Sequence, residues 1–454
     1  MSNNSSNESF KSSNESSYMS SSNEYTDSYF NSENSDLFVG KILNNYIIIK
    51  YLGGGDYSSV WLCYSTKTRN FYAAKISEKD KCDYDSIINE TEIYKKLKDN
   101  CHALGYIDGF TFIDDIDVKR GMIVLELCNG SVYDFLKMII HNGDKIPLRF
   151  AQKTIKSSIM VFKSLHELGY AHSDYKLGNM LIQSKKLIHD NTNHELKKKI
   201  NNILDKKNKK KMNEEIMDLV IESNKKTSIY DKKEINTKYY EHIMSELHKD
   251  DDGNNDIQIK MCDFGSCIKI ENIKGSLYYT DDYRAPEVIM GIDYDDKNDI
   301  WALGCSISEL LHGKSICDGD KHIYLSRHRS QFYKMIHYFG KEDINNDINS
   351  ESDNYIYCGD YFFGKRKYIP KYLYDQCEEK FFFFKKNNNI KGFDNIPINA
   401  YKIDHDVHNT PLLIEQDNVD VVNVLKNNMI DMFELDFHKR KNINQIADAM
   451  LEYL

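Results

Sequence analysis

His172-Ser173-Asp174-Tyr175-Lys176-Leu177-Gly178-Asn179 is the stretch that decides the fold of this 454-residue chain. Asp174 is placed to accept the proton of a hydroxyl group and to orient that hydroxyl for in-line attack. Lys176 can reach a phosphoryl group in transfer, and Asn179 can bind a metal ion. His172 is expected to brace the loop through hydrogen bonds. Surface loops rarely match eight residues by accident, so we interpret this stretch as a catalytic loop.

A glycine-rich turn precedes this loop, between two expected strands. Its glycines would let backbone N–H groups approach the phosphates of a nucleotide, and Val60 would pack on the adenine face. Ser58 stands where a third glycine is usual, and a glycine-rich hairpin without a ligand explains the turn alone at least as well. The expected nucleotide-binding residues here are Leu52, Gly53, Gly54, Gly55, Asp56, Tyr57, Ser58, Ser59 and Val60.

Lys75 follows two alanines at the end of the next apolar strand. A lysine on a buried strand is costly unless it is paired, and nucleotide phosphates together with a helix carboxylate would supply the pairing. Glu90 and Glu92 lie two residues apart on the following helix and therefore face different sides of it. We expect Glu92 to be the partner of Lys75. A surface lysine that merely ends a strand is the alternative.

Lys260-Met261-Cys262-Asp263-Phe264-Gly265 supplies a further carboxylate after a short apolar strand. Asp263 would bind Mg²⁺ and bridge it to the phosphates of ATP, with Asn179 as the second metal ligand. The sequence thus predicts ATP and Mg²⁺ as cofactors.

Three residues beyond this segment are expected to hold the site together. Thr280 should hydrogen-bond near Asp174 and Lys176, and Asp299 should hold the backbone of the catalytic loop. Glu287 can pair with Arg440.

Periodicity divides the chain into a small β-rich part and a large helical part, an α+β organisation. Strands are expected over residues 46–51, 59–64, 71–76 and 121–127, with a helix over 86–97 between them. Helical periodicity then dominates, as in 155–168 and 300–311. The small lobe is expected at about 46–127 and the large lobe at about 128–454.

Three segments depart from this organisation. Residues 1–36 are rich in Ser and Asn and poor in large apolar side chains, which predicts disorder. Residues 186–256 are rich in Lys, Asn, Asp and Glu, so we interpret them as a charged, solvated insert with one or two helices. Residues 314–417 show little pattern but contain enough aromatic side chains to pack, including four phenylalanines at 381–384.

The net charge, the cysteine count and the lack of long apolar stretches limit which kinds of molecule the chain is expected to bind. The chain has a formal net charge of −10, which argues against direct nucleic-acid binding and would suit a basic substrate. Ten cysteines without a C-x-x-C pair indicate neither a disulfide framework nor a zinc site. No signal peptide and no membrane-spanning stretch is recognised. We therefore expect a monomeric intracellular protein, cytoplasmic or nuclear, that does not contact membranes.

Taken in order, these motifs resemble those of eukaryotic serine/threonine protein kinases, from residue 46 to the C-terminus. The resemblance implies a two-lobed kinase fold and phosphoryl transfer from ATP to protein hydroxyls; in that family, a lysine two residues after the catalytic aspartate distinguishes serine/threonine from tyrosine kinases. Within the CMGC group, the segment from Leu52 to Leu62 and the position of the insert are most similar to SR-protein kinases. The resemblance to that subfamily implies Arg/Ser-rich substrates, for which Asp293, Asp295 and Asp296 are candidate docking residues, although we favour a solvated loop as the explanation of these aspartates.

Two departures from the family pattern matter. Ser173 replaces the arginine that commonly precedes the catalytic aspartate and receives an activation-loop phosphate, so we hypothesise that activity does not require phosphorylation there. Asp263-Phe264-Gly265 and Ala285-Pro286-Glu287 are standard for kinases in general, whereas SR-protein kinases often depart from both. A pseudokinase or scaffold that keeps the fold is the main alternative, and a kinase for small molecules is the second.

Overall fold

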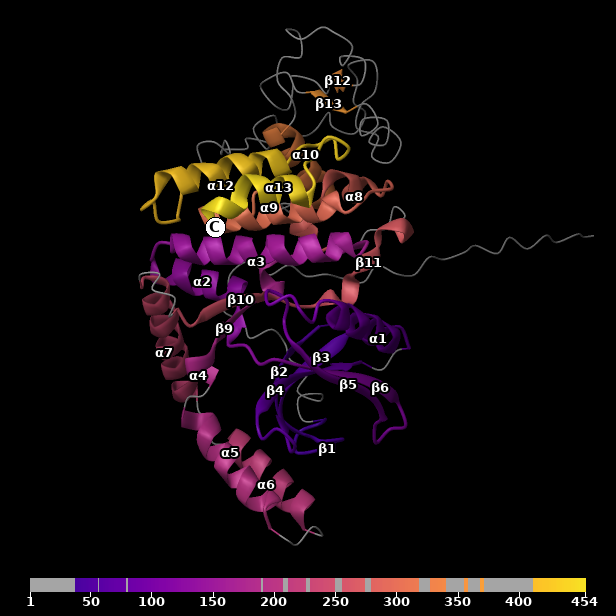
Figure 1. Ribbon diagram of the computed structural model, residues 1–454, viewed down its shortest axis with the longest axis vertical. Helices are drawn as coiled ribbons and strands as arrows, with labels where there is room; N and C mark the ends of the chain where they lie inside the picture. The colour runs from indigo at the N-terminus through magenta and orange to yellow at the C-terminus, as the bar shows by residue number, and fades with distance from the viewer. Residues whose placement is uncertain are drawn as a thin grey trace, which may run out of the picture.

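The computed structural model describes residues 37–55, 57–78, 81–188, 191–206, 211–225, 229–249, 255–273, 279–317, 327–339, 355–357, 368–370 and 411–454. These residues form a small lobe built on one antiparallel sheet and a larger, mainly helical lobe (Figure 1). The two-lobed α+β architecture expected from the sequence is therefore confirmed. The expected disordered leader, residues 1–36, lies outside the described residues.

A six-stranded antiparallel sheet in the order β1-β2-β3-β4-β6-β5 forms the small lobe. Its strands are β1 (Ile42–Leu43), β2 (Tyr46–Gly54), β3 (Ser58–Ser65), β4 (Phe71–Ser77), β5 (Tyr106–Ile113) and β6 (Lys119–Leu125). All four expected strands are present. The edge strand β5 was not predicted, because most of its side chains are at least partly exposed and its apolar alternation is weak.

Helix α1 (Lys81–Lys96) packs against this sheet through one stripe of side chains. Ile87, Glu90 and Tyr94 are all buried, at the i, i+3, i+7 spacing of one helix face. A carboxylate thus lies in an otherwise apolar stripe, which is costly unless a cation meets it.

The large lobe is a set of helices around α3 and α9 (Figure 1). Its helices are α2 (Val132–Asn142), α3 (Leu148–Glu167), α8 (Pro286–Met290), α9 (Lys297–His312), α10 (Arg327–Phe339), α12 (Val419–Met432) and α13 (Ile443–Met450). Both helices expected from periodicity, over 155–168 and 300–311, are present as α3 and α9. Among the described helices, none is both long and apolar enough to cross a membrane.

Short strands flank the segments that contain Asp174, Asn179 and Asp263. They are β7 (Gly130–Ser131), β8 (Tyr170–Ala171), β9 (Met180–Ser184), β10 (Ile257–Met261) and β11 (Ile268–Lys269). Strands β9 and β10 pair antiparallel, with Met180 opposite Met261 and Ser184 opposite Ile257. One end of this hairpin therefore joins the two ends of the insert, and the other brings Asn179 beside the residues that follow Met261.

The insert folds into α4 (Lys185–Ile188), α5 (Asn191–Leu204), α6 (Met212–Lys225) and α7 (Ile229–Leu247). Leu196 and Ile200 of α5, with Ile216 and Val220 of α6, are buried in the apolar core of the small lobe. The prediction of a solvated segment with one or two helices was therefore wrong. Each helix spaces its apolar residues four apart among many charged ones, so a low average hydrophobicity hides a continuous apolar face.

Helix α7 contacts the large lobe instead. The rings of Tyr239 and Tyr240 pack against Phe135 with centroid distances of 5.7 and 5.6 Å. At its C-terminal end Glu246 contacts Lys249 and Lys186, and these hydrogen bonds lower its pKa to about 2, although burial opposes the shift. The insert is thus anchored on both lobes, along the edge that Figure 1 shows.

Residues 314–417 are described only in part. They contribute α10 and the two-stranded pair β12 (Tyr355–Tyr357) and β13 (Tyr368–Pro370). Phe332, on α10, is buried in the core of the large lobe, as the aromatic content of this region suggested. The phenylalanine run at 381–384 lies outside the described residues.

Candidate active site

The catalytic loop and the segment that carries Thr280 are joined by short hydrogen bonds. Lys176 Nζ lies 3.0 Å from Asp174 Oδ2 and 2.7 Å from Thr280 Oγ1. Thr280 also donates to Asp174 Oδ1 through its backbone N–H, at 3.0 Å, and its hydroxyl, at 2.7 Å. The expected contact of Thr280 with Asp174 and Lys176 is confirmed. These bonds fix the direction of the Asp174 carboxylate, which a base that orients a hydroxyl requires.

Asp299, at the start of α9, holds the backbone of the loop through hydrogen bonds. Its carboxylate accepts from the N–H groups of His172, at 2.8 Å, and Ser173, at 3.1 Å. The side chain is fully buried, and burial alone would raise its pKa, but the His166 hydrogen bond and the neighbouring imidazoles leave the pKa lowered. The expected role of Asp299 as a support for the loop backbone is confirmed.

Ser173 occupies a tight position that suits a small side chain. It is buried and has φ = 63°, in the left-handed region. Its hydroxyl has no hydrogen-bond partner among the described residues. Because serine is uncharged, this position itself offers no cation to a phosphate.

Asn179 and Asp263 meet at the end of the β9–β10 hairpin. Asn179 donates its side-chain N–H to the backbone carbonyl oxygen of Asp174 at 2.8 Å, and its backbone carbonyl oxygen accepts from the Cys262 N–H at 2.8 Å. Asp263 follows directly, with φ = 64°. This left-handed turn redirects the chain and aims the Asp263 carboxylate at Lys75.

Lys75 bridges two carboxylates from different parts of the chain. Its Nζ lies 2.7 Å from Glu90 Oε2 and 2.7 Å from Asp263 Oδ1. Burial by itself would lower the pKa of Lys75, but the charges of Asp263 and Glu90 raise it. In return the charge of Lys75 holds the pKa of Asp263 at about 2. This cluster keeps Lys75 protonated and Asp263 ionised.

The prediction that Glu92 pairs with Lys75 was wrong, because Glu90 does so. Glu90 shares the buried stripe of α1 with Ile87 and Tyr94, whereas Glu92 points to solvent and pairs with Lys95 at 2.9 Å. Residues two positions apart on a helix point in directions about 200° apart, so only one of the two glutamates can face the sheet. The i, i+3, i+7 spacing with Ile87 and Tyr94 was the sequence signal that would have identified Glu90.

Phe264 connects α1 to the catalytic loop. Its ring lies 4.9 Å from Tyr94 and 5.6 Å from His172. His172 is buried and accepts a hydrogen bond from the backbone N–H of Asp174 at 3.3 Å, in keeping with the bracing role expected for it. The position of α1 and the geometry of the catalytic loop are thus linked through the packed rings of Tyr94, Phe264 and His172.

The glycine-rich turn joins β2 and β3. At Gly54 a Cβ atom would lie 2.9 Å from the carbonyl oxygen of Ser58, so the hairpin can close only around a glycine. Gly53 and Gly55 face open space, and Asp56 lies outside the described residues. Val60 is paired with Lys75 across β3 and β4, which places their side chains on one face of the sheet.

Glu287 and Arg440 form a fully buried ion pair that joins α8 to the segment before α13. The guanidinium donates to both carboxylate oxygens, at 2.6 and 3.0 Å. The expected pair is confirmed. It holds the segment that follows Thr280 against the helical lobe.

The oxygen atoms that face the cluster suit a small divalent cation and a polyphosphate. Asp263 offers a carboxylate, and Asn179 offers its amide oxygen while its amide nitrogen is used internally. Mg²⁺ prefers such oxygen ligands and completes its shell with phosphate and water oxygens. Elsewhere among the described residues, no group of three or more His, Cys, Asp or Glu is gathered to hold a metal ion.

The three candidate docking aspartates lie in the short segment before α9. Asp293 is exposed, but Asp296 pairs with His166 at 3.1 Å. Asp295 accepts from the backbone N–H of Lys297 at 3.0 Å. Two of the three are thus engaged around the start of α9.

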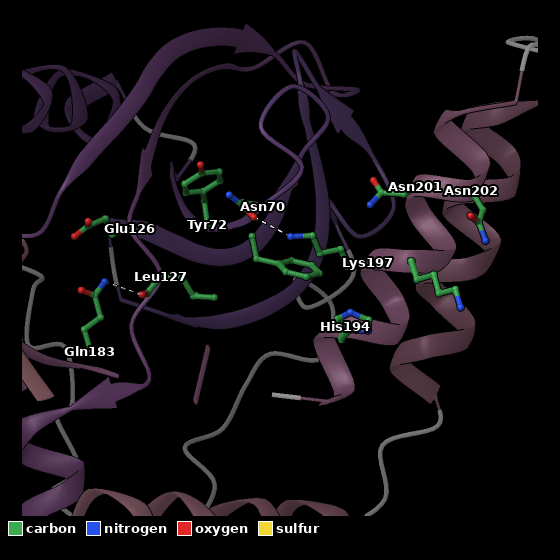
Figure 2. A pocket seen from close by; sticks show the side chains of 11 residues that line it. Asn70, Tyr72, Glu126, Leu127, Gln183, His194, Lys197, Asn201 and Asn202 are labelled. Atoms are coloured by element: carbon green, nitrogen blue, oxygen red, sulfur yellow. Dashed lines mark hydrogen bonds between the residues drawn. The ribbon is translucent and has the colours of Figure 1, made fainter. Parts of the chain in front are cut away.

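A cavity of about 510 Å³ lies outside the site, between α5 and the small lobe (Figure 2). Phe71 and Tyr72 line one side, and Glu126 and Leu127, between the lobes, line another. Figure 2 shows Lys197 of α5 reaching Asn70, at 2.9 Å. No pattern in the sequence indicated this cavity, because it arises only where the insert meets the sheet.

Comparison with known proteins agrees with this geometry. A family model described as "Protein kinase domain" matches residues 46–448. A crystal structure of a kinase domain superimposes with a TM-score of 0.55 and 16% sequence identity, covering 91% of this chain and 98% of the other. That similarity supports the fold.

Three of the curated relatives that the chain matches are protein kinases. The probable serine/threonine-protein kinase clkA of Dictyostelium discoideum is 25% identical over 62% of this chain and 26% of its own length. The dual specificity protein kinase lkh1 of Schizosaccharomyces pombe is 25% identical over 61% of this chain and 32% of its own length. The serine/threonine-protein kinase AFC3 of Arabidopsis thaliana is 24% identical over 60% and 55%. The matched part of this chain thus spans about a quarter to a half of these relatives.

Proposed function

The chain belongs to the protein kinase family, and from this premise we propose that it is a serine/threonine protein kinase that transfers the γ-phosphoryl group of ATP to protein hydroxyls. The observation that carries the proposal is the contact of Lys75 with both Glu90 and Asp263 beside an intact catalytic loop. A binding protein without chemistry would have no need to keep Lys75, Asp174, Asn179 and Asp263 together. This argues against the pseudokinase alternative.

Each residue has a defined task in this mechanism. Asp174 accepts the hydrogen bond of the substrate hydroxyl and orients it for attack, and Lys176 stabilises negative charge on the phosphoryl oxygens. Lys75, kept in place by Glu90, binds the nucleotide phosphates. Asp263 and Asn179 would hold Mg²⁺, which supplies charge neutralisation on the phosphate oxygens.

Phosphotransfer from Mg·ATP to generic basic proteins tests the proposal, with Asp174→Ala as the inactive comparison. Loss of the orienting carboxylate should lower kcat by roughly 10²-fold or more. Equal incorporation of label by wild type and Asp174→Ala would reject the mechanism.

We infer two finer properties. The first is a preference for basic, Arg/Ser-rich substrates, supported by the likeness of the glycine-rich turn and insert position to SR-protein kinases and by the net charge of −10. Side-by-side kcat/KM values for an Arg/Ser peptide and a lysine-free acidic peptide would test it. Comparable values would remove the preference while leaving the kinase activity itself intact.

The second property is activity without an activation-loop phosphate. Ser173 offers no cation to a phosphate, and Thr280 holds Asp174 through its own backbone N–H and hydroxyl. Protein shown by mass spectrometry to be unmodified at Ser276, Tyr278, Tyr279 and Thr280 should be fully active. A strict requirement for modification would contradict this inference.

A further inference from the structure

Tyr279 has an unusual backbone conformation for a bulky residue. Its φ is 97°, in a region that side chains larger than glycine avoid. The residue is nonetheless only 6% exposed. Strained residues of this kind persist where surrounding contacts hold them, and they gather at functional sites.

One of the contacts that hold Tyr279 is made by its hydroxyl. This group donates to Oδ1 of Asp299, the same oxygen that accepts from the backbone N–H of Ser173. The other oxygen, Oδ2, accepts from His172 N–H. One buried carboxylate therefore accepts hydrogen bonds from both the catalytic loop and the segment after residue 278, and so links the two.

The backbone beside Tyr279 transmits this anchor to the site. The next residue is Thr280, whose N–H and hydroxyl both donate to Asp174. On the other side of the peptide, the Tyr279 carbonyl oxygen accepts from Arg284 Nε at 2.8 Å. Any relaxation of the strained φ would move Thr280 away from the catalytic carboxylate.

We propose that Tyr279 is a positioning residue, whose buried hydroxyl ties the Thr280 segment to Asp299 and so orders Asp174 without a phosphate. This proposal rests on the proposed kinase function and deepens it. In phosphorylation switches, a phosphate paired with arginine side chains can order such a segment. Here the neutral phenol of Tyr279 and the buried carboxylate of Asp299 provide the link. Ser173, whose backbone N–H also donates to Asp299, brings no positive charge.

Phosphorylation of Tyr279 would disrupt this arrangement. A phosphate on Tyr279 would place negative charge against the buried Asp299 carboxylate and would remove the donor that holds the segment. The active form is therefore the one in which Tyr279 is unmodified.

Tyr279→Phe tests the proposal because it removes the hydroxyl alone. Tyr46→Phe is the matched control: the Tyr46 hydroxyl also donates to a carboxylate, that of Asp108, at 3.0 Å, and Tyr46 is 5% exposed. That bond lies on the small-lobe sheet, away from the catalytic loop. The control therefore reports what the loss of a comparable phenol–carboxylate bond does to stability alone.

We expect Tyr279→Phe to lower kcat about tenfold, the effect of losing one hydrogen bond to a charged group, with the KM for ATP within about twofold of wild type. Tyr46→Phe should lower the melting temperature without lowering kcat. A Tyr279→Phe kcat within about twofold of wild type, or an equal loss in Tyr46→Phe, overturns the proposal.

Hydrogen exchange supplies a readout that does not depend on activity. In Tyr279→Phe the amide of Thr280 should exchange faster than in wild type, and in Tyr46→Phe it should not. Unchanged exchange at Thr280 would refute the positioning role even if the protein had no kinase activity. If instead wild type transferred no more phosphate than Asp174→Ala, the proposed function would fail while the exchange result still decided the role of Tyr279.

Discussion

Replacing Glu90 with glutamine should damage phosphoryl transfer far more than the same change at Glu92. Glu90→Gln keeps the shape of the side chain but removes the charge that lies 2.7 Å from Lys75 Nζ. Glu92→Gln removes a charge of the same kind two residues away on the same helix. The pair therefore separates the role of the buried carboxylate from any general effect on α1.

The size of the effect follows from burial. Breaking a fully buried ion pair costs about 3–5 kcal/mol. Lys75 keeps its second partner, Asp263, so a smaller loss of about 1.5–3 kcal/mol is expected, that of one hydrogen bond between charged groups. This corresponds to a roughly 10- to 150-fold lower kcat/KM for ATP. The Glu92–Lys95 pair is exposed, and such pairs contribute about 0–1 kcal/mol to stability and nothing to the site.

Steady-state kinetics with varied Mg·ATP and a fixed protein substrate would measure both variants. Glu92→Gln should stay within about twofold of wild type. Equal losses in the two variants, or a Glu90→Gln enzyme as active as wild type, would show that the Lys75–Glu90 contact does not organise the site.

Three further predictions concern stability. Arg440→Ala should destabilise the large lobe by about 3–5 kcal/mol in urea unfolding, because it leaves Glu287 charged and buried, and a loss below 1 kcal/mol would contradict this. Ile200→Ala should cost about 2–5 kcal/mol because Ile200 is buried in the small-lobe core, whereas the exposed Asn202→Ala should change little; equal effects would mean that α5 is not packed there. Glu246 has a pKa of about 2 in the folded protein against an ordinary 4.5, so its contribution to the free energy of unfolding is full above pH 4.5 and is lost as the pH falls toward 2. The stability difference between wild type and Glu246→Gln should therefore shrink over that pH window. A difference that does not depend on pH would contradict this.

Local patterns sufficed for much of the fold. Strand and helix patterns identified β2, β3, β4, β6, α1, α3 and α9, because their apolar residues either recur at a regular period or form a short continuous run, as in the buried strand β6. Motif spacing likewise led to the contacts of Thr280, Asp299 and the Glu287–Arg440 pair. It could do so because each of these residues sits in a short segment of recognisable pattern.

The failures came where residues distant in sequence meet. The insert looked solvated because its apolar residues are few, yet Leu196, Ile200, Ile216 and Val220 lie on the faces that meet the sheet. Composition averages over a helix, whereas burial depends on which side of the helix meets another element. The same reason explains the cavity between α5 and the small lobe.

The sequence by itself determined the catalytic loop, since Asp174, Lys176 and Asn179 lie within six consecutive residues and local backbone geometry brings them together. It also determined that Lys75 needs a carboxylate, because an unpaired lysine on a buried strand is too costly. Only the tertiary structure decided which carboxylate that is, since the rotation of α1 against the sheet sets whether Glu90 or Glu92 faces Lys75. The partner of the Tyr279 hydroxyl was decided in the same way: Asp299 is twenty residues away in sequence and reaches it only because the start of α9 lies against the catalytic loop.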